Sequence, residues 1–262
     1  MWKDTEYEDR LICFVDILGF KELVELSTCQ PVAMHDIALG DERPRDTKGL
    51  CAIFESIHSL LQMHKDEHYD PNSERYKELA NYRPPFFQKG DTPDFQFNVF
   101  SDSIVFSATR LSLDTLMLFC NMIETITSLL FECSTTCRGG IAWGKLFHKD
   151  NILFGPAMVE AYQLEQQANY PRVIFSPDII RGLSPNDMSE MSKFWLTQDV
   201  DGWFFVDIIK SYLGCPDQGI MLTPYFRELR NDFRCLWYMT WECAGGCIWD
   251  AGAVRFFTLA EG

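Results

Sequence analysis

The stretches LICFVDILGF (residues 11–20) and FQFNVFSDSIVFS (residues 95–107) decide the fold of this chain. In each, β-branched and aromatic residues predict a buried strand, and one aspartate, Asp16 or Asp102, interrupts the apolar run. A carboxylate among apolar side chains is costly unless a positive group neutralises it. If the strand that ends at Asp16 lies beside a tight turn at Asp102, the two carboxylates meet and suit a hard divalent cation. The alternative is two unrelated aspartates that cap turns at strand ends.

Composition limits the partners of the chain. With 262 residues, of which 47% are apolar, it is long enough to bury a large core. It carries 23 Lys and Arg against 38 Asp and Glu, a formal net charge of -15. This charge argues against a general nucleic-acid-binding surface, so a polyanionic substrate would need a local positive group or a metal ion.

The ends and the cysteines predict a cytoplasmic protein. The first ten residues, MWKDTEYEDR, contain no apolar segment of the secretory type, and no run approaches the roughly 18 apolar residues of a membrane span. The ten cysteines are therefore expected to be free thiols. Cys133-x3-Cys137 and Cys243-x3-Cys247 lack the CxxC spacing of zinc ligands, so no structural zinc site is expected.

Hydrophobic periodicity predicts an alternation of strands and helices. The first half is predicted to contain a strand at 11–17, helices at 20–26 and 48–64, and a hairpin of strands at 95–100 and 103–109. The second half is predicted to contain a helix at 113–131, a strand at 137–147, a helix at 155–168, a strand at 172–175 and one or two strands within 194–209. The order β-α-β-β-α-β is typical of a ferredoxin-like α+β fold, in which helices cover one face of an antiparallel sheet.

The domain organisation follows from the breaks between these elements. Residues 1–185 are predicted to form the catalytic domain, with an insertion at about 66–94 where prolines and polar residues prevent regular structure. Residues 186–262 are predicted to be a C-terminal elaboration of the same domain. The role of its tail, which is rich in tryptophan and cysteine, stays open.

Four sequence blocks together resemble the catalytic domain of class III nucleotidyl cyclases. FVDILGF, FSDSIVFS, RGGIAWGKLF and FGPAMVEAYQLE occur in this order on the expected elements, and the resemblance covers roughly residues 10–180. It implies an adenylate/guanylate cyclase-like fold and two divalent ions, Mn²⁺ or Mg²⁺. Asp16 and Asp102 match the metal-binding positions, and the carbonyl of Ile17 matches an additional backbone ligand.

The resemblance also implies a triphosphate site. The turn Leu18-Gly19-Phe20 precedes a helix, where backbone amides suit phosphate oxygens. Arg138 matches a position that binds the β- and γ-phosphates, and a guanidinium is suited to that task. The alternatives are an ordinary strand-to-helix glycine at Gly19 and a surface charge at a strand end for Arg138.

The sequence departs from the family pattern at the base and transition-state positions. Asn98 stands where purine cyclases carry a base-reading lysine or glutamate, and the apolar Ile152 stands at the second base-reading position. Val159 and Gln163 replace the transition-state asparagine and arginine. Three outcomes follow from the missing arginine: the enzyme is slow, another basic residue such as Lys145, Arg172 or Lys210 substitutes, or catalysis has been lost.

These departures favour a smaller base. Tyr162 and Ile152 would narrow the base pocket, and with the FVDILGF and GPAMVEAY blocks the chain resembles the pyrimidine cyclases of the bacterial Pycsar anti-phage system. That resemblance implies UTP as the favoured substrate, with CTP as the second candidate, and a separate effector that responds to cyclic UMP or cyclic CMP.

It also implies a homodimer. Asp16, Asp102 and Arg138 of one chain would face the base-binding residues Asn98, Ile152 and Tyr162, together with Gln163, of the other. No nucleic-acid or membrane partner is expected.

Two alternatives remain: a purine cyclase, and a degenerate cyclase-like domain that binds nucleotide as a sensor. A polymerase-like or diguanylate-cyclase-like enzyme would instead carry a Gly-Gly-acidic hairpin, where this chain has Phe100-Ser101-Asp102-Ser103.

Overall fold

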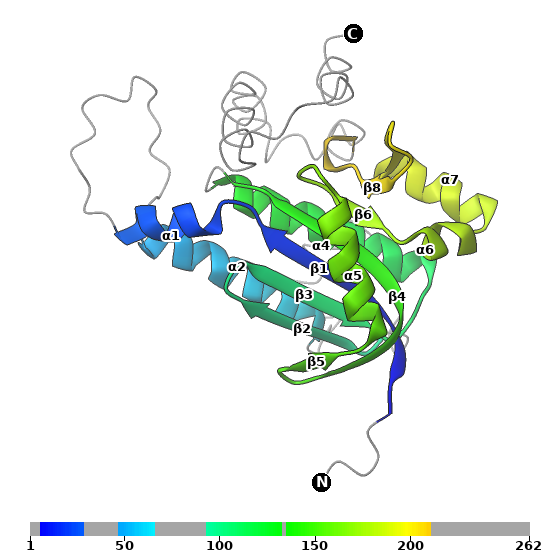
Figure 1. The fold of residues 1–262 in the computed structure, drawn as a ribbon, viewed down its shortest axis with the longest axis horizontal. Helices are drawn as coiled ribbons and strands as arrows, with labels where there is room; N and C mark the ends of the chain where they lie inside the picture. The colour runs from blue at the N-terminus through cyan, green and yellow to red at the C-terminus, as the bar shows by residue number, and fades with distance from the viewer. Residues whose placement is uncertain (1–5, 29–46, 66–92, 133–134, 211–262) are drawn as a thin grey trace, which may run out of the picture.

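The computed structural model describes residues 6–28, 47–65, 93–132 and 135–210 (Figure 1). Most of the predicted insertion, at 66–92, lies outside these ranges, as does the tail at 211–262 with its cysteine pair.

The first half of the chain forms a ferredoxin-like unit. Its elements are β1 (Glu8–Ile17), α1 (Phe20–Thr28), α2 (Thr47–Lys65), β2 (Phe95–Phe100), β3 (Ser103–Ala108), α4 (Leu113–Glu132) and β4 (Cys137–Lys149). The strands lie in the order β2-β3-β1-β4, and each neighbouring pair is antiparallel. The predicted α+β fold with a mostly antiparallel sheet is confirmed. β1 begins three residues earlier than the predicted start at residue 11, because Glu8, Asp9 and Arg10 still pair with β4.

The second half extends the same sheet. Its elements are β5 (Ile152–Phe154), α5 (Pro156–Gln167), β6 (Val173–Phe175), α6 (Pro177–Gly182), α7 (Pro185–Phe194), β7 (Leu196–Gln198) and β8 (Phe204–Val206). β6 runs parallel to β4, β8 and β7 follow it, and β5 pairs with the end of β4. The sequence analysis missed β5, α6 and α7. Both helices had a sequence signal, since Ser176 and Ser184 cap them and a proline follows each cap.

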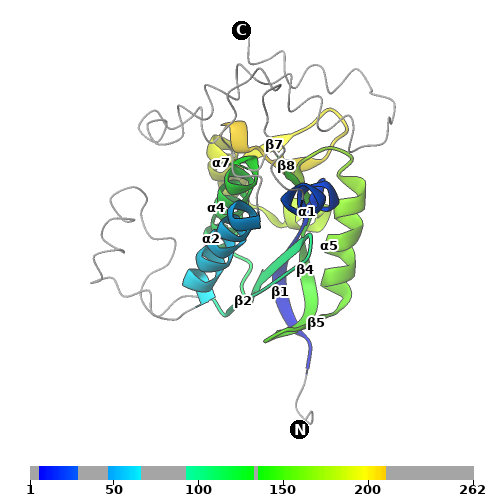
Figure 2. The same ribbon diagram turned by 90° about the vertical axis from the view of Figure 1, so that its left-hand side faces the viewer.

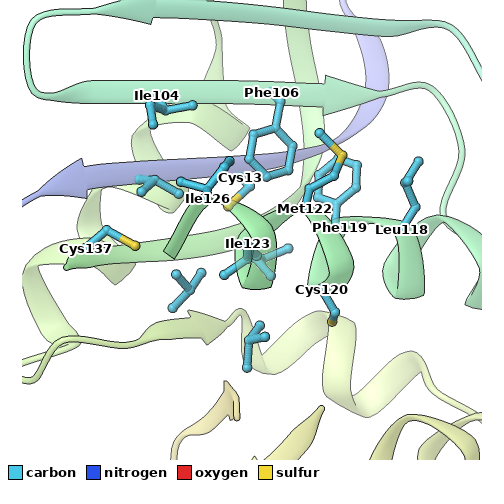
Figure 3. Packing of buried hydrophobic residues seen from close by; sticks show 14 of the residues in the cluster. Cys13, Ile104, Phe106, Leu118, Phe119, Cys120, Met122, Ile123, Ile126 and Cys137 are labelled. Atoms are coloured by element: carbon cyan, nitrogen blue, oxygen red, sulfur yellow. The ribbon is translucent and has the colours of Figure 1, made fainter. Parts of the chain in front are cut away.

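Helices α2 and α4 cover one face of the sheet (Figure 2). Phe106 of β3 packs on Phe119 of α4, with ring centroids 4.8 Å apart, and Cys13, Ile123 and Ile126 surround them (Figure 3). The segment Leu113–Phe131 is the one described helix long and apolar enough to cross a membrane, and 61% of that window is buried. Its apolar side packs against the sheet in the largest core cluster.

The opposite face is only partly covered. α5 packs there against β1 and β4, as Figure 2 shows. The expectation that the helices cover only one face of the sheet therefore does not hold for α5. Gly140 allows this approach, because a Cβ at that position would lie 2.4 Å from the Cβ of Leu164. On the part of this face formed by β2, Asn98 is partly exposed and Phe100 is 53% exposed.

Candidate active site

Asp16 and Asp102 lie on segments that are far apart in the sequence but next to each other in space. Alternate residues of β1, Ile12 and Phe14, pack on the α5 side of the sheet, so Asp16 shares that side. The register places Asp16 opposite Ser103 of β3. The amide of Ile17 donates to the carbonyl oxygen of Asp102 at 2.7 Å, which joins the end of β1 to the β2–β3 turn.

Asp16 has an unfavourable environment for its negative charge. The pKa of this carboxyl is raised to about 6, first by burial and then by the carboxylates of Glu165 and Asp102, while Arg138 opposes them. Asp16 and Glu165 thus share the Arg138 guanidinium, and Asp102 adds a further negative charge beside Asp16. This excess of negative charge is the condition under which a bound cation is favourable.

Arg138 is held mainly by a carboxylate that sequence analysis missed. Its Nε and Nη2 both contact Glu165 of α5, which is 1% exposed, whereas Nη2 lies 3.9 Å from the Asp16 carboxylate. Register also sets Arg138 opposite Asp16 across β1 and β4. Glu165 had a sequence signal: it follows Ala161 by four residues, on the helix face that carries the apolar stripe.

The turn between β1 and α1 is anchored at both sides. Gly19 has φ 68°, a conformation that glycine adopts without strain, and its carbonyl accepts the amide of Leu23 at 3.0 Å. The amide of Leu18 donates to the carbonyl of Thr136 at 2.9 Å, and the Thr135 hydroxyl donates to the Leu18 carbonyl. The helix that begins at Phe20 presents its first amides at this turn.

The predicted base-binding residues fall into two places. Tyr162 of α5 is 49% exposed and meets Phe14 edge to face, with centroids 5.7 Å apart, so it stands on the Asp16 side of its own chain. Its neighbour Gln163 is exposed. Asn98 pairs in register with Val105, which pairs with Phe14, so two strand spacings separate Asn98 from β1.

Ile152 lies on the β4–β5 hairpin, where it is 42% exposed. The turn of the same hairpin reaches Asn98, since the carbonyl of Asp150 lies within hydrogen-bonding distance of the Asn98 amide. The structure therefore gathers Asp16, Asp102, Arg138 and Tyr162 in one region, and Asn98 with the Ile152 hairpin in another.

The basic residues considered as substitutes for the missing arginine have other partners. Lys145 pairs with Asp9 at 2.8 Å on the surface. Arg172 is enclosed by two aspartates, Asp199 and Asp201, and Lys210 points to the β7 backbone at the Leu196 carbonyl. Within this chain, none of the three contacts Asp16, so the expectation that one of them replaces the arginine gains no support.

The residues present fit a metal site only in part. Within the described ranges, no three His, Cys, Asp or Glu side chains are placed to bind one ion. The predicted set has two carboxylates, Asp16 and Asp102, and the Ile17 carbonyl. Phosphate and water oxygens would have to complete the six-fold shell that Mg²⁺ prefers. The raised pKa of Asp16 agrees with a site in which negative charge exceeds positive charge.

Comparison with known proteins finds similarity only at the level of solved structures. No protein-family model and no curated protein matches the chain. The adenylyl cyclase CyaB from P. aeruginosa is 12% identical, with 77% of this chain and 95% of that chain covered and a TM-score of 0.38. An adenylate/guanylate cyclase/hydrolase from Silicibacter pomeroyi is 14% identical, with 77% and 98% covered and a TM-score of 0.43.

A third similar structure is the catalytic core of a rhodopsin-guanylyl cyclase with converted specificity, solved in complex with ATPalphaS. It is 15% identical, with 77% of this chain and 96% of that chain covered and a TM-score of 0.40. At such identities and TM-scores the function has to be argued from the side chains of this chain.

Proposed function

We propose that this protein is a nucleotidyl cyclase. It would convert a pyrimidine nucleoside triphosphate, with UTP preferred over CTP, to the 3′,5′-cyclic monophosphate and pyrophosphate. The observation that supports this most is the contact between the end of β1 and the β2–β3 turn, which brings Asp16 and Asp102 together beside Arg138.

The residues of this region would have separate roles in binding metal ions and phosphate groups. Asp16, Asp102 and the Ile17 carbonyl would bind two divalent ions. When bound, such ions lower the pKa of the attacking hydroxyl and neutralise phosphate charge. Arg138 would orient the β- and γ-phosphates through its forked donors.

The β1–α1 turn would add backbone donors to this phosphate site. Because the Leu18 amide is bonded to Thr136, the amides of Gly19 and Phe20 are the donors that remain there for phosphate oxygens. Leu18 would shape the turn.

A homodimer would complete the site. Asn98 and Ile152 lie away from Asp16 within one chain, and the same face exposes Phe100 and Tyr162 at 53% and 49%. A second copy that covers these side chains would bring its Asn98 and Ile152 toward the triphosphate held by the first, whose own Tyr162 already lies on the Asp16 side. The product would act in the cytoplasm as a signal in anti-phage defence, read by a separate effector.

The sensor reading is a second candidate with an observation of its own. Gln163 is exposed at the position of the missing arginine, and Glu165 holds Arg138 in a closed ion pair. A chain of this kind would bind a triphosphate without turning it over.

The test incubates the purified full chain with each of the four ribonucleoside triphosphates and Mn²⁺, and resolves cyclic products by chromatography. Cyclic UMP is expected as the main product. Asp16→Ala and Asp102→Ala should each abolish turnover, whereas Asp178→Ala, which removes an exposed carboxylate of α6, should not. No product, together with a melting temperature raised by a triphosphate, would establish the sensor. A purine product would overturn the pyrimidine specificity.

A further inference from the structure

A buried polar network lies beneath Asn98 on the α5 side of the sheet. Arg10 of β1 is 1% exposed, Ser107 of β3 is fully buried and His148 of β4 is 5% exposed. The Nε of Arg10 donates to the Ser107 hydroxyl at 3.0 Å, and that hydroxyl lies 2.8 Å from Nδ1 of His148. The other ring nitrogen of His148, Nε2, lies 3.4 Å from the inner atom of the Asn98 amide.

The buried charge in this network is balanced. The Nη1 of Arg10 contacts the Glu8 carboxylate at 2.8 Å and the Asp94 carboxylate at 2.7 Å. Burial lowers the pKa of His148 to about 4, and the positive charges of Arg10 and Lys65 contribute, against the opposing carboxylate of Asp94. His148 is therefore a neutral ring at pH 7, with one protonated nitrogen.

Two backbone carbonyls define which way the Asn98 amide points. Its inner atom lies 3.0 Å from the carbonyl oxygen of Asp150 and 2.6 Å from that of Phe97. Carbonyl oxygens only accept hydrogen bonds, so the inner atom must be the nitrogen, and the amide oxygen faces the other way.

The same assignment determines the tautomer of His148. Because Nε2 faces the NH₂ group of Asn98, this ring nitrogen acts as an acceptor and the proton resides on Nδ1. Nδ1–H then donates to the Ser107 hydroxyl, which also accepts from Arg10 Nε and so uses both of its lone pairs. In this arrangement each contact from Arg10 to Asn98 joins a donor to an acceptor.

We propose that His148 is a positioning residue that holds Asn98 with its amide oxygen outward, as a hydrogen-bond acceptor for the base. This inference rests on the proposed function, in which Asn98 contacts the base. Uracil can satisfy the acceptor through its ring N3–H, whereas cytosine presents a lone pair at the same atom. A site that leaves a buried polar group unpaired rejects the wrong ligand, so the network would favour UTP over CTP.

The kinetic test compares kcat/KM for UTP and CTP in full-length variants. His148→Leu removes the ring contact to the Asn98 amide, and Ser107→Ala removes the hydroxyl that orients that ring. In each variant the amide therefore keeps only the Asp150 and Phe97 carbonyls. Each variant should lower the UTP-to-CTP preference by about tenfold, the contribution of one hydrogen bond. The control is Thr127→Ala, which deletes a buried hydroxyl on α4 that donates to the Ile123 carbonyl at 2.7 Å. It should lower the melting temperature without changing the preference. An unchanged preference in both network variants would overturn the proposal.

A second measurement requires no turnover. The nitrogen chemical shifts of ¹⁵N-histidine in the full chain report the tautomer of each ring, and His148→Leu identifies the signal among the five histidines. A proton on Nδ1 is expected; a proton on Nε2 would overturn the amide orientation. If the wild-type chain forms no cyclic nucleotide, the proposed function fails. The nitrogen shifts of His148 still decide the orientation of the Asn98 amide. A melting temperature raised equally by UTP and CTP would then overturn the base preference.

Discussion

At the scale of single residues, Asp16 is the proposed metal ligand whose surroundings oppose its own negative charge. A carboxyl with a pKa of about 6 is kept partly protonated by burial and by Glu165 and Asp102, with only partial relief from Arg138. Acids with strongly shifted pKa values are common at catalytic and ligand-binding sites, and structural ion-pair networks also shift pKa values. Three consequences can be measured.

Replacing Asp16 with asparagine should stabilise the metal-free chain at pH 7.5. The wild-type carboxylate must be charged there in a site that opposes charge, so its removal should raise the free energy of unfolding by about 1–2 kcal/mol, as seen in denaturant titrations. Asp178→Asn removes an exposed carboxylate and should change little. A destabilised Asp16→Asn protein would show that the carboxylate stabilises the fold.

The pH dependence of the wild-type chain should follow from the same group. The pKa of Asp16 rises from 3.8 to about 6 on folding, so between these values the folded chain binds more protons than the unfolded chain. The contribution of Asp16 to stability is therefore complete below pH 3.8 and is lost as the pH rises through about 6. Binding of Mn²⁺, which needs the carboxylate, should strengthen over the same interval, as calorimetry at pH 5.5 and 7.5 can measure. Equal affinity at both values would contradict this assignment.

Replacing Glu165 with glutamine should break the ion pair that holds Arg138. A guanidinium that loses a buried partner costs stability, by about 3 kcal/mol. Arg138 would then be left to Asp16 alone, so the pKa of Asp16 should fall and Mn²⁺ binding should shift to lower pH. Glu160→Gln is the matched control, because Glu160 lies on the same helix and accepts a hydrogen bond from Ser176. The idea fails if both variants bind Mn²⁺ with the same pH dependence.

At the scale of elements, the approach of α5 to β4 places Glu165 against Arg138. Gly140 permits it, and a Cβ there would meet the Leu164 Cβ at 2.4 Å and the Ala161 carbonyl at 2.5 Å. Gly140→Ala should therefore push α5 from the sheet and cost about 1–3 kcal/mol in chemical denaturation. Gly144→Ala faces the same helix, with its Cβ 3.6 Å from that of Ala157, and should be tolerated. Similar losses in both variants would mean that the helix approach is not what limits position 140.

At the scale of the whole molecule, the separation of Asn98 from Asp16 predicts a shared site. Light scattering should give a mass of twice 30.4 kDa. Asp16→Ala and Asn98→Ala each disable one half of the site, so a mixture that exchanges subunits should recover about a quarter of wild-type turnover, since half of its dimers hold one intact site of two. A mixture no more active than its components, despite exchange, would place both residues in one chain's site.

The sequence by itself determined the strand that carries Asp16 and the hairpin that turns at Asp102, because runs of β-branched and aromatic residues favour buried strands. It also determined the α+β order and the helices at α2 and α4. The short elements β5, α6 and α7 were missed, since segments of this length carry little periodicity even where Ser-Pro caps begin them.

Only the tertiary structure decided which groups surround these residues. The burial of Glu165 against Arg138, and the chain of contacts from Arg10 through Ser107 to His148, join positions far apart in the sequence. Such contacts depend on the distance between packed elements, and a single glycine, Gly140, permits the close approach of α5 to β4. No local sequence pattern encodes that distance.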